Sequence, residues 1–179
     1  ARVSDGKING RVSRLLVTPL LRALMKTLGD MEYLDYMDSF RYPLSGEFAM
    51  TRDLITRIRI PSDWGLEIGV LSDVKRNYST NRLCQVDIAN NYDHKHQSLS
   101  PEDREAGLAK MSTDIAKSIY RKLATEGIVI SSSFLRTLKA TYLRNALDFV
   151  EIYYYDAKIN GLSFNRHEEE EAVEVFQQG

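Results

Sequence analysis

Leucine and other apolar side chains recur at helical spacing in the first part of the chain. This spacing predicts an amphipathic helix over residues 10–28. Gly29 directly follows the last of these leucines and should end the helix, because glycine is a common helix stop. Pro19 lacks a backbone N–H, so it should kink the helix or restart it at that point. Residues 1–9 are polar and contain a glycine, and they predict a loop.

Further helices are predicted where capping residues precede apolar positions. Thr51 is a good N-cap for a short helix, and Ser62 or Asp63 can cap the next one. Pro101 and the acidic residues behind it begin a long helix, and the serines at 131–133 cap another. The predicted helices span residues 52–58, 64–75, 101–125 and 134–158, with a last short helix within residues 168–178.

Residues 82–89 carry the one convincing strand pattern of the chain. A sheet of one or two strands is not stable alone, since three or more strands or helical cover are normally required. The chain is therefore either nearly all-helical, or its strands pair with a sheet formed by sequence outside it. The polar start favours the second interpretation. We then expect residues 6–125 to be a layer of helices with one or two strands whose edges are open or completed elsewhere.

Composition narrows the class of protein. The chain has 179 residues, of which 43% are hydrophobic, enough for one domain with a core. Lys and Arg number 24 against 25 Asp and Glu, so a basic nucleic-acid-binding face is excluded as the dominant feature. Cys84 is the single cysteine, which excludes a disulfide framework. No apolar run is long enough for a membrane helix, and nothing signals export. We expect a soluble cytoplasmic protein with neither nucleic-acid nor membrane partners.

Two local patterns suggest ligand binding. His94 and His96 flank a lysine, and two imidazoles at this spacing can offer nitrogen ligands to a metal. The alternative is a solvated polar loop. The segment from Gly10 to Ser13 lies at the start of the first helix, where free N–H groups, a glycine, a hydroxyl and a guanidinium suit a phosphate or carboxylate. An ordinary N-cap with a solvated Arg11 is the alternative there.

Acidic residues in unusual surroundings are the third pattern. Glu47 and Glu67 both lie inside otherwise apolar runs, where a carboxylate is costly to bury unless it is paired or has a chemical role. A satisfied buried ion pair is the alternative for each of them. The acidic run at residues 168–171 predicts a solvated helix face.

Taken together, these segments are more informative than any of them alone. Their order along the chain is GRVSRLLVTPLLRAL, YPLSGEFAMTRDLI, DWGLEIGVLSDV and QVDIANNYDHKHQSL. This order resembles the second half of the glucosyl-3-phosphoglycerate synthases, in which comparable G-R-V-T, P-L-S/G-G-E-Y-A, G-V-E-I-G-L-L and Q-V-N-L…H segments follow one another. The resemblance is collinear over about residues 6–125. Mannosyl-3-phosphoglycerate synthases are similar at several of the same places.

The resemblance implies an α/β fold, namely the C-terminal half of a GT-A glycosyltransferase, helix-rich and with few strands. Such an enzyme transfers glucose from UDP-glucose to the 2-hydroxyl of 3-phosphoglycerate with retention, using Mg²⁺ or Mn²⁺. The family's Asp-x-Asp metal motif precedes the segment seen here, so this chain alone is expected to be inactive. On this interpretation residues 1–125 form the acceptor and metal-histidine half, and residues 126–179 a helical extension that could mediate a homodimer.

The resemblance also implies roles for particular residues. Ser13 stands where the family usually has Thr, and Trp64 where it often has Tyr. Acceptor binding is implied for Gly10, Arg11, Val12, Ser13 and His96, and donor binding for Trp64, Gly65, Leu66 and Glu67.

Catalysis and metal binding are implied at three positions, one of which, Glu67, is also a donor-binding residue. Glu67 would lie at the sugar, and Glu47 near it. His94 would be the metal ligand from this half, once a one-residue insertion at residues 90–92 is allowed. His96 stands where mycobacterial-type enzymes have Asn, so the identity of the acceptor stays open. Two alternatives to the glucosyltransferase also stay open, a mannosyltransferase using GDP-mannose and a non-catalytic helical interaction module.

Overall fold

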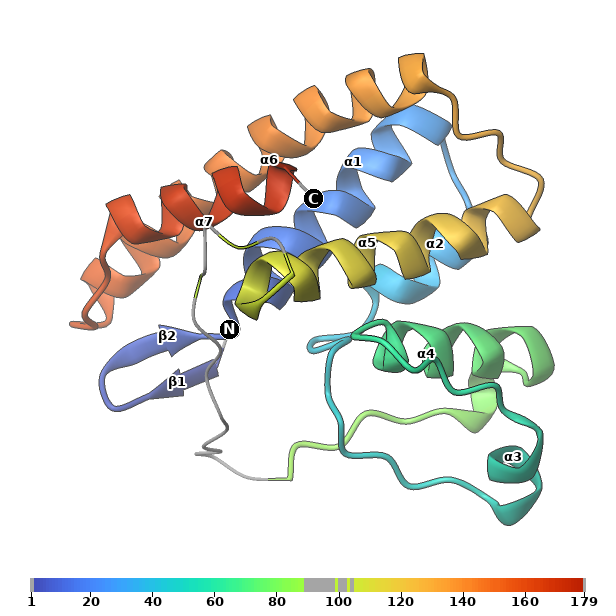
Figure 1. The fold of residues 1–179 in the computed structure, drawn as a ribbon. Coiled ribbons are helices and arrows are strands. Elements are labelled where there is room, and N and C mark those ends of the chain that lie inside the picture. The colour runs from blue at the N-terminus through green and yellow to red at the C-terminus, as the bar shows by residue number, and fades with distance from the viewer. Residues whose placement is uncertain (1, 89–98, 100–102, 104, 179) are drawn as a thin grey trace.

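The computed structural model describes residues 2–88, 99, 103 and 105–178. For Arg2 it describes only the backbone. Helices dominate these residues, and a short hairpin precedes them (Figure 1). The strands are β1 (Arg2–Ser4) and β2 (Lys7–Asn9). The helical elements are η1 (Ser13–Val17), α1 (Thr18–Leu28), α2 (Glu32–Asp38), α3 (Arg52–Arg57), α4 (Leu66–Asn77), η2 (Thr80–Arg82), α5 (Gly107–Thr125), α6 (Ser132–Ile159) and α7 (Arg166–Gln178).

The predicted first helix is confirmed, together with its restart at Pro19. Helical backbone begins at Arg11, widens into the π-helical turn η1 and continues as α1, which has Pro19 in its first turn. A π-helical turn accommodates a break in the regular hydrogen-bond ladder, which a proline produces because it has no N–H to donate. Gly29 ends α1 with φ of 81°, a backbone conformation that favours glycine.

The core forms where this first helix meets the C-terminal helices. α1 packs along α6, and α7 packs against η1 and α6 (Figure 1). Leu15, Leu24, Leu138 and Val150 from these elements are almost completely buried. The Tyr142 hydroxyl of α6 donates to the Leu15 carbonyl at 2.8 Å, so polar groups within the core are also paired. Residues beyond 125 thus share one core with the first helix, while their status as a separate extension stays a prediction.

A second layer contains α2, α4 and α5 (Figure 1). The Tyr33 hydroxyl of α2 lies 3.0 Å from Ser72 Oγ, and the Tyr36 hydroxyl donates to the Leu71 carbonyl at 3.2 Å. Burial raises the pKa of Tyr33 to about 12, so its hydroxyl stays protonated at neutral pH. This layer fixes the start of α4 relative to the first helix.

The other predicted helices are confirmed except at their starts, whereas α2 lies where the sequence pattern predicts no helix. Thr51 caps α3 by accepting from Leu54 N, and Ser131 caps α6 by accepting from Phe134 N. α4 and α5 begin at Leu66 and Gly107, later than the predicted residues 64 and 101.

The predicted strand at residues 82–89 is wrong over residues 82–88, which the structure describes. Residues 83–88 have no regular structure there. The Gln85 side chain accepts from Arg41 N at 2.9 Å and donates to the Ser39 carbonyl at 3.2 Å, so a side chain, not a strand ladder, connects this segment to its neighbour. Val86 and Ile88 remain 71% and 60% exposed.

The expectation of a loop at residues 1–9 is also wrong, because β1 and β2 form a two-stranded antiparallel hairpin there. Val3 pairs with Ile8 in its register. Asp5 and Gly6 make the turn with φ of 49° and 69°, the conformation that Asp-Gly turns favour. This hairpin is the only sheet within the described residues, so no sheet of four or more strands occurs there.

Candidate functional site

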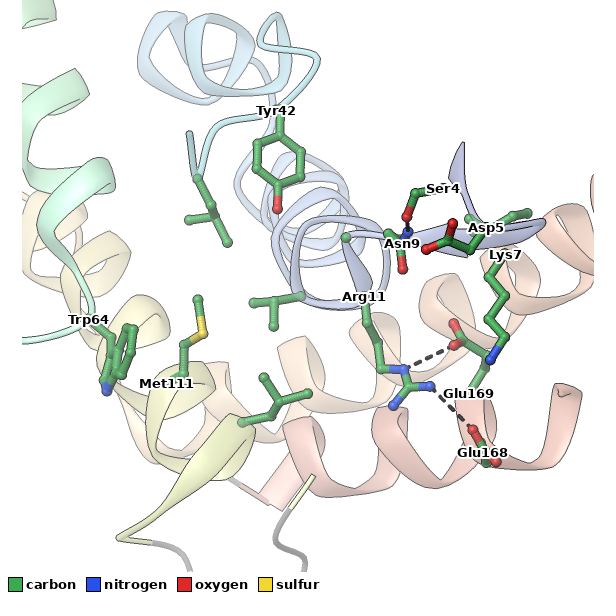
Figure 2. Close-up of a pocket in the computed structure, with 15 residues that line it drawn as sticks. Ser4, Asp5, Lys7, Asn9, Arg11, Tyr42, Trp64, Met111, Glu168 and Glu169 are labelled. Atoms are coloured by element: carbon green, nitrogen blue, oxygen red, sulfur yellow. Dashed lines mark hydrogen bonds and ion pairs between the residues drawn. The ribbon is translucent and has the colours of Figure 1, made fainter. Parts of the chain in front are cut away.

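A cavity of about 590 Å³ lies at the start of the first helix (Figure 2). The hairpin contributes Lys7, the helix start contributes Arg11, and the loop before α4 contributes Trp64. The first turn of α5 and the acidic end of α7 complete the wall. Of the residues predicted to bind ligands, the cavity is lined by Gly10, Arg11, Val12 and Trp64. Segments far apart in the sequence therefore meet at the predicted anion-binding position.

Gly10 shapes the entrance to the helix. Its φ is +77°, which L side chains rarely adopt, and a Cβ at this position would lie 3.0 Å from Tyr42 Cε2. The Gly10 carbonyl accepts from Arg14 N at 3.0 Å, the first turn of the helix. N–H groups in a first turn have no intrahelical acceptor and attract anions. Glycine therefore allows both the sharp turn into the helix and the close approach of Tyr42.

The Arg11 guanidinium is held by carboxylates of α7. Arg11 Nε donates to Glu169 Oε1 at 2.9 Å, and the NH2 nitrogen lies 3.6 Å from Glu168 Oε2 (Figure 2). The expected solvated acidic face at residues 168–171 is wrong at Glu169, which is only 6% exposed. Its burial follows from the packing of α7 onto η1 and from the pairing of its charge.

Arg14 is a second buried partner of Glu169. Its NH2 nitrogen donates to Glu169 Oε2 at 2.7 Å, and its Nε donates to the Asn9 carbonyl at 3.0 Å. The guanidinium also lies 4.7 Å from the centre of the Tyr153 ring, a cation–π contact. Sequence reasoning missed Arg14 and Glu169. Arg14 does lie three residues after Arg11, on a neighbouring part of the helix surface, which is a usable signal for a shared partner.

Ser13 follows Val12 in the chain but does not line the cavity. It is 5% exposed, and its hydroxyl has no hydrogen-bond partner within the described part of the chain. One nitrogen of the Arg14 guanidinium, NH1, is buried in the same unpaired state. Buried polar atoms without a partner are uncommon and costly, so this helix turn has unused hydrogen-bonding capacity next to the cavity.

The two carboxylates predicted near the sugar lie close to one another. Glu67 is in the first turn of α4, and a Cβ on Gly46 would lie 3.9 Å from its Oε1. Burial raises the pKa of Glu67, the negative charge of Glu47 raises it further, and a backbone hydrogen bond opposes both. Glu47 is exposed and accepts from Ser45 Oγ at 2.7 Å. A carboxyl group whose pKa is raised in this way can hold a proton more easily than an exposed one.

The loop that carries Glu47 borders a second cavity of about 690 Å³. Residues 83–87 and α4 form its other walls. Tyr42 lines both cavities, and Figure 2 shows its ring in the first of them. Glu47 and Arg11 therefore line two neighbouring cavities, and the Tyr42 side chain is part of the wall of both.

The start of α4 is closely packed. Gly65 N donates to Asp63 Oδ1 at 3.0 Å, and a Cβ on Gly65 would lie 2.7 Å from Ser118 Cβ of α5. Leu66 begins the helix directly behind it. Trp64 stays 41% exposed at the cavity, as an aromatic side chain available to a ligand.

The predicted metal ligand His94 and the predicted acceptor residue His96 lie outside the described residues. Within residues 2–88 and the other described positions, no group of three or more His, Cys, Asp or Glu residues could hold a metal ion. The described side chains therefore offer no site that fits Mg²⁺ or Mn²⁺, and metal binding stays a prediction that depends on His94. No helix of the described chain has the length and apolarity to span a membrane.

Comparisons with known proteins identify relatives of a single name. The chain is 52% identical over 176 residues to a glucosyl-3-phosphoglycerate synthase from Persephonella marina, an alignment that covers 98% of this chain and 43% of that protein. It is 47% identical over 171 residues to one from Methanococcoides burtonii, covering 94% of this chain and 41% of that protein. A third, from Mycolicibacterium paratuberculosis, is 33% identical over 91 residues, which are 51% of this chain and 25% of that protein.

The chain thus spans about two-fifths of the length of the first two relatives. It corresponds to their C-terminal part. No family model matches the chain. No solved structure matches it either.

Proposed function

Because the chain is homologous to the C-terminal part of the glucosyl-3-phosphoglycerate synthases, we propose that it is the acceptor-binding part of a glucosyltransferase. The substrate class follows from the name that these relatives share. The observation that carries the assignment of this part is the cavity at the first helix, in which Arg11 lies beside the helix N-terminus. The nucleotide part of the donor would be held by sequence outside this chain, as expected for one part of a GT-A fold.

The two cations at the cavity support an anionic acceptor, and they lie beside the carboxylates of Asp5, Glu168 and Glu169, which line it as well. 3-Phosphoglycerate has a phosphate and a carboxylate, and each needs a positive partner when it leaves water. Arg11 and Lys7 are the cations that line the cavity, and Lys7 makes no ion pair with the described residues. The oriented N–H groups of the first helical turn add a further positive end. Acceptor binding at this position explains why Gly10, Arg11 and Lys7 lie together.

The donor sugar would lie on the Trp64 side of the same cavity, near Glu67. The acceptor's 2-hydroxyl attacks the anomeric carbon, the new glycosidic bond forms, and the bond to the UDP oxygen breaks on the same face. The leaving diphosphate takes the hydroxyl proton, so the products are UDP and glucosyl-3-phosphoglycerate. In this scheme the residues of the chain orient the reactants, which converts a bimolecular encounter into a reaction within one complex. A divalent metal, expected at His94, would supply charge stabilisation for the leaving phosphates.

Replacing Arg11 with Ala in the full-length protein that contains this chain tests the proposal. A charge-assisted contact to an anion contributes about 1.5–3 kcal/mol, so the KM for 3-phosphoglycerate should rise about 10- to 150-fold. The KM for UDP-glucose should change little. Arg11→Lys should recover only part of the loss, because an ammonium lacks the planar fork of donors. Initial-rate kinetics with each substrate varied in turn make the measurement. A changed donor KM with an unchanged acceptor KM would place the wrong ligand at this helix.

A further inference from the structure

We infer that Glu169 is a positioning residue that holds Arg11 ready for the anionic acceptor. The inference rests on the proposed function, and it goes beyond it by giving the C-terminal helix a part in acceptor binding. Glu169 touches no ligand in this assignment. It acts through the guanidinium that it orients.

The geometry of the carboxylate is the first argument. Its two oxygens contact two different arginines, with Oε1 2.9 Å from Arg11 Nε and Oε2 2.7 Å from Arg14 NH2. Both distances lie in the range of strong charge-assisted hydrogen bonds. Glu169 occupies the Nε edge of Arg11, and Figure 2 shows one terminal nitrogen directed away from both carboxylates. The side chain is therefore fixed at one edge while part of its fork stays open.

The charge balance is the second argument. A lone Arg11–Glu169 pair would be neutral and would have little attraction for an anion. Arg14 is 3% exposed and shares the same carboxylate, so two positive charges face one negative charge. The two guanidiniums and the Glu169 carboxylate therefore carry one net positive charge, which the Glu168 carboxylate, also paired with Arg11, offsets only in part. Glu168 also lies near Arg11, but it is 57% exposed and 3.6 Å away, so water screens its effect.

The support behind Glu169 is the third argument. Ala172, Val173 and Phe176 of α7 are buried in the core, so the carboxylate is attached to a packed helix. Because this helix packs on η1, Glu169 and Arg11 keep their relative position before any ligand arrives. A contact that is formed in advance reduces the loss of side-chain entropy on binding.

The test replaces Glu169 with Gln in the full-length protein. Gln has one acceptor oxygen and an NH₂ group that faces a guanidinium unfavourably, so it cannot hold both arginines. We expect the acceptor KM to rise about tenfold, while kcat and the donor KM stay within about twofold. Glu170→Gln is the matched control, since it removes the same charge from the same helix but pairs with Arg166 and not with Arg11. The control should leave both KM values unchanged.

A double variant separates positioning from structural support. In an Arg11→Ala background, Glu169→Gln should add less than a twofold change to the acceptor KM, because the residue through which it acts is gone. A further large rise would overturn the inference, as would equal rises of both KM values in the single variant. If Glu169→Gln fails to fold, Glu169→Asp keeps the charge but is one methylene shorter, and should raise the acceptor KM several-fold with the donor KM unchanged.

Failure of the proposed function gives a different result. If Arg11→Ala leaves the acceptor KM unchanged, the acceptor does not bind at this helix, and both assignments are wrong. If Arg11→Ala raises the acceptor KM but Glu169→Gln does not, the acceptor site stands and the positioning role of Glu169 is refuted.

Discussion

Replacing Gly10 with Ala should destabilise the protein by an amount that can be worked from the structure. Two effects add at this position. The backbone has φ of +77°, and the new methyl group would lie 3.0 Å from Tyr42 Cε2. Gly161 offers a matched control, since its φ is +65° but a Cβ there meets nothing within 4 Å. The difference between the two variants isolates the contact with Tyr42.

The magnitudes follow from the physical cost of each effect. A left-handed backbone costs a non-glycine residue about 1–2 kcal/mol, and the lower entropy of the unfolded Ala chain returns about 0.4–1 kcal/mol. Gly161→Ala should therefore lower the free energy of unfolding by about 1 kcal/mol, and by no more than about 1.6 kcal/mol. Displacing the Tyr42 ring from its rotamer adds about 0.5–1.5 kcal/mol to this cost. Gly10→Ala should therefore lower the free energy of unfolding by about 2 kcal/mol.

Urea unfolding of both variants and the parent protein, monitored by circular dichroism, measures these values. Replacing Tyr42 with Leu should reduce the extra cost at Gly10, because the ring atom that the methyl group meets is removed. Equal destabilisation by Gly10→Ala and Gly161→Ala would refute the reasoning. It would show that Tyr42 adapts freely and that its approach to the helix start is not constrained.

The remaining predictions concern charge and metal. His94→Ala in the full-length protein should weaken Mg²⁺ or Mn²⁺ dependence and strongly reduce turnover, whereas His167→Ala should be nearly silent; metal titration of the rate checks this, and unchanged activity of the His94 variant at limiting metal would contradict it. The raised pKa of Glu67 means that the folded state binds its proton more tightly, so stability should fall as pH rises from the ordinary Glu pKa to the raised one, and Glu67→Gln should flatten this slope in urea unfolding. Lys7→Met should raise the acceptor KM about two- to fivefold, as expected for one exposed charge, and an unchanged acceptor KM would exclude Lys7 from the site.

Local patterns were enough to predict most helices. The periodic leucines, the proline restart and the caps at Thr51 and Ser131 all act within one or two turns, so each can be recognised from neighbouring residues. The hairpin was missed because its strands have only three residues each, too few for an alternating pattern. The Asp5–Gly6 pair, a typical hairpin turn, is the one local signal of the hairpin.

The candidate site was predictable only in part, for a similar reason. Gly10 and Arg11 could be recognised because a helix start with these residue types suits an anion on local grounds. Arg14 and Glu169 could not be paired from the sequence, since 155 positions separate them and an acidic run on a helix usually faces water. Their pairing depends on how α7 packs, which is a property of the whole core.

At residues 83–88 the local pattern predicts an element that the structure does not contain. Its residue types favour a strand, but a strand is completed by hydrogen bonds to a neighbouring strand, and no described residue offers one there. The exposed Val86 and Ile88 are the side chains that a neighbouring layer would cover, and the Gln85 side chain makes the contacts to Ser39 and Arg41. A strand pattern in the sequence therefore predicts a strand only if a neighbouring strand is present to pair with the segment. Completion of the fold by a sheet from sequence outside this chain stays a prediction.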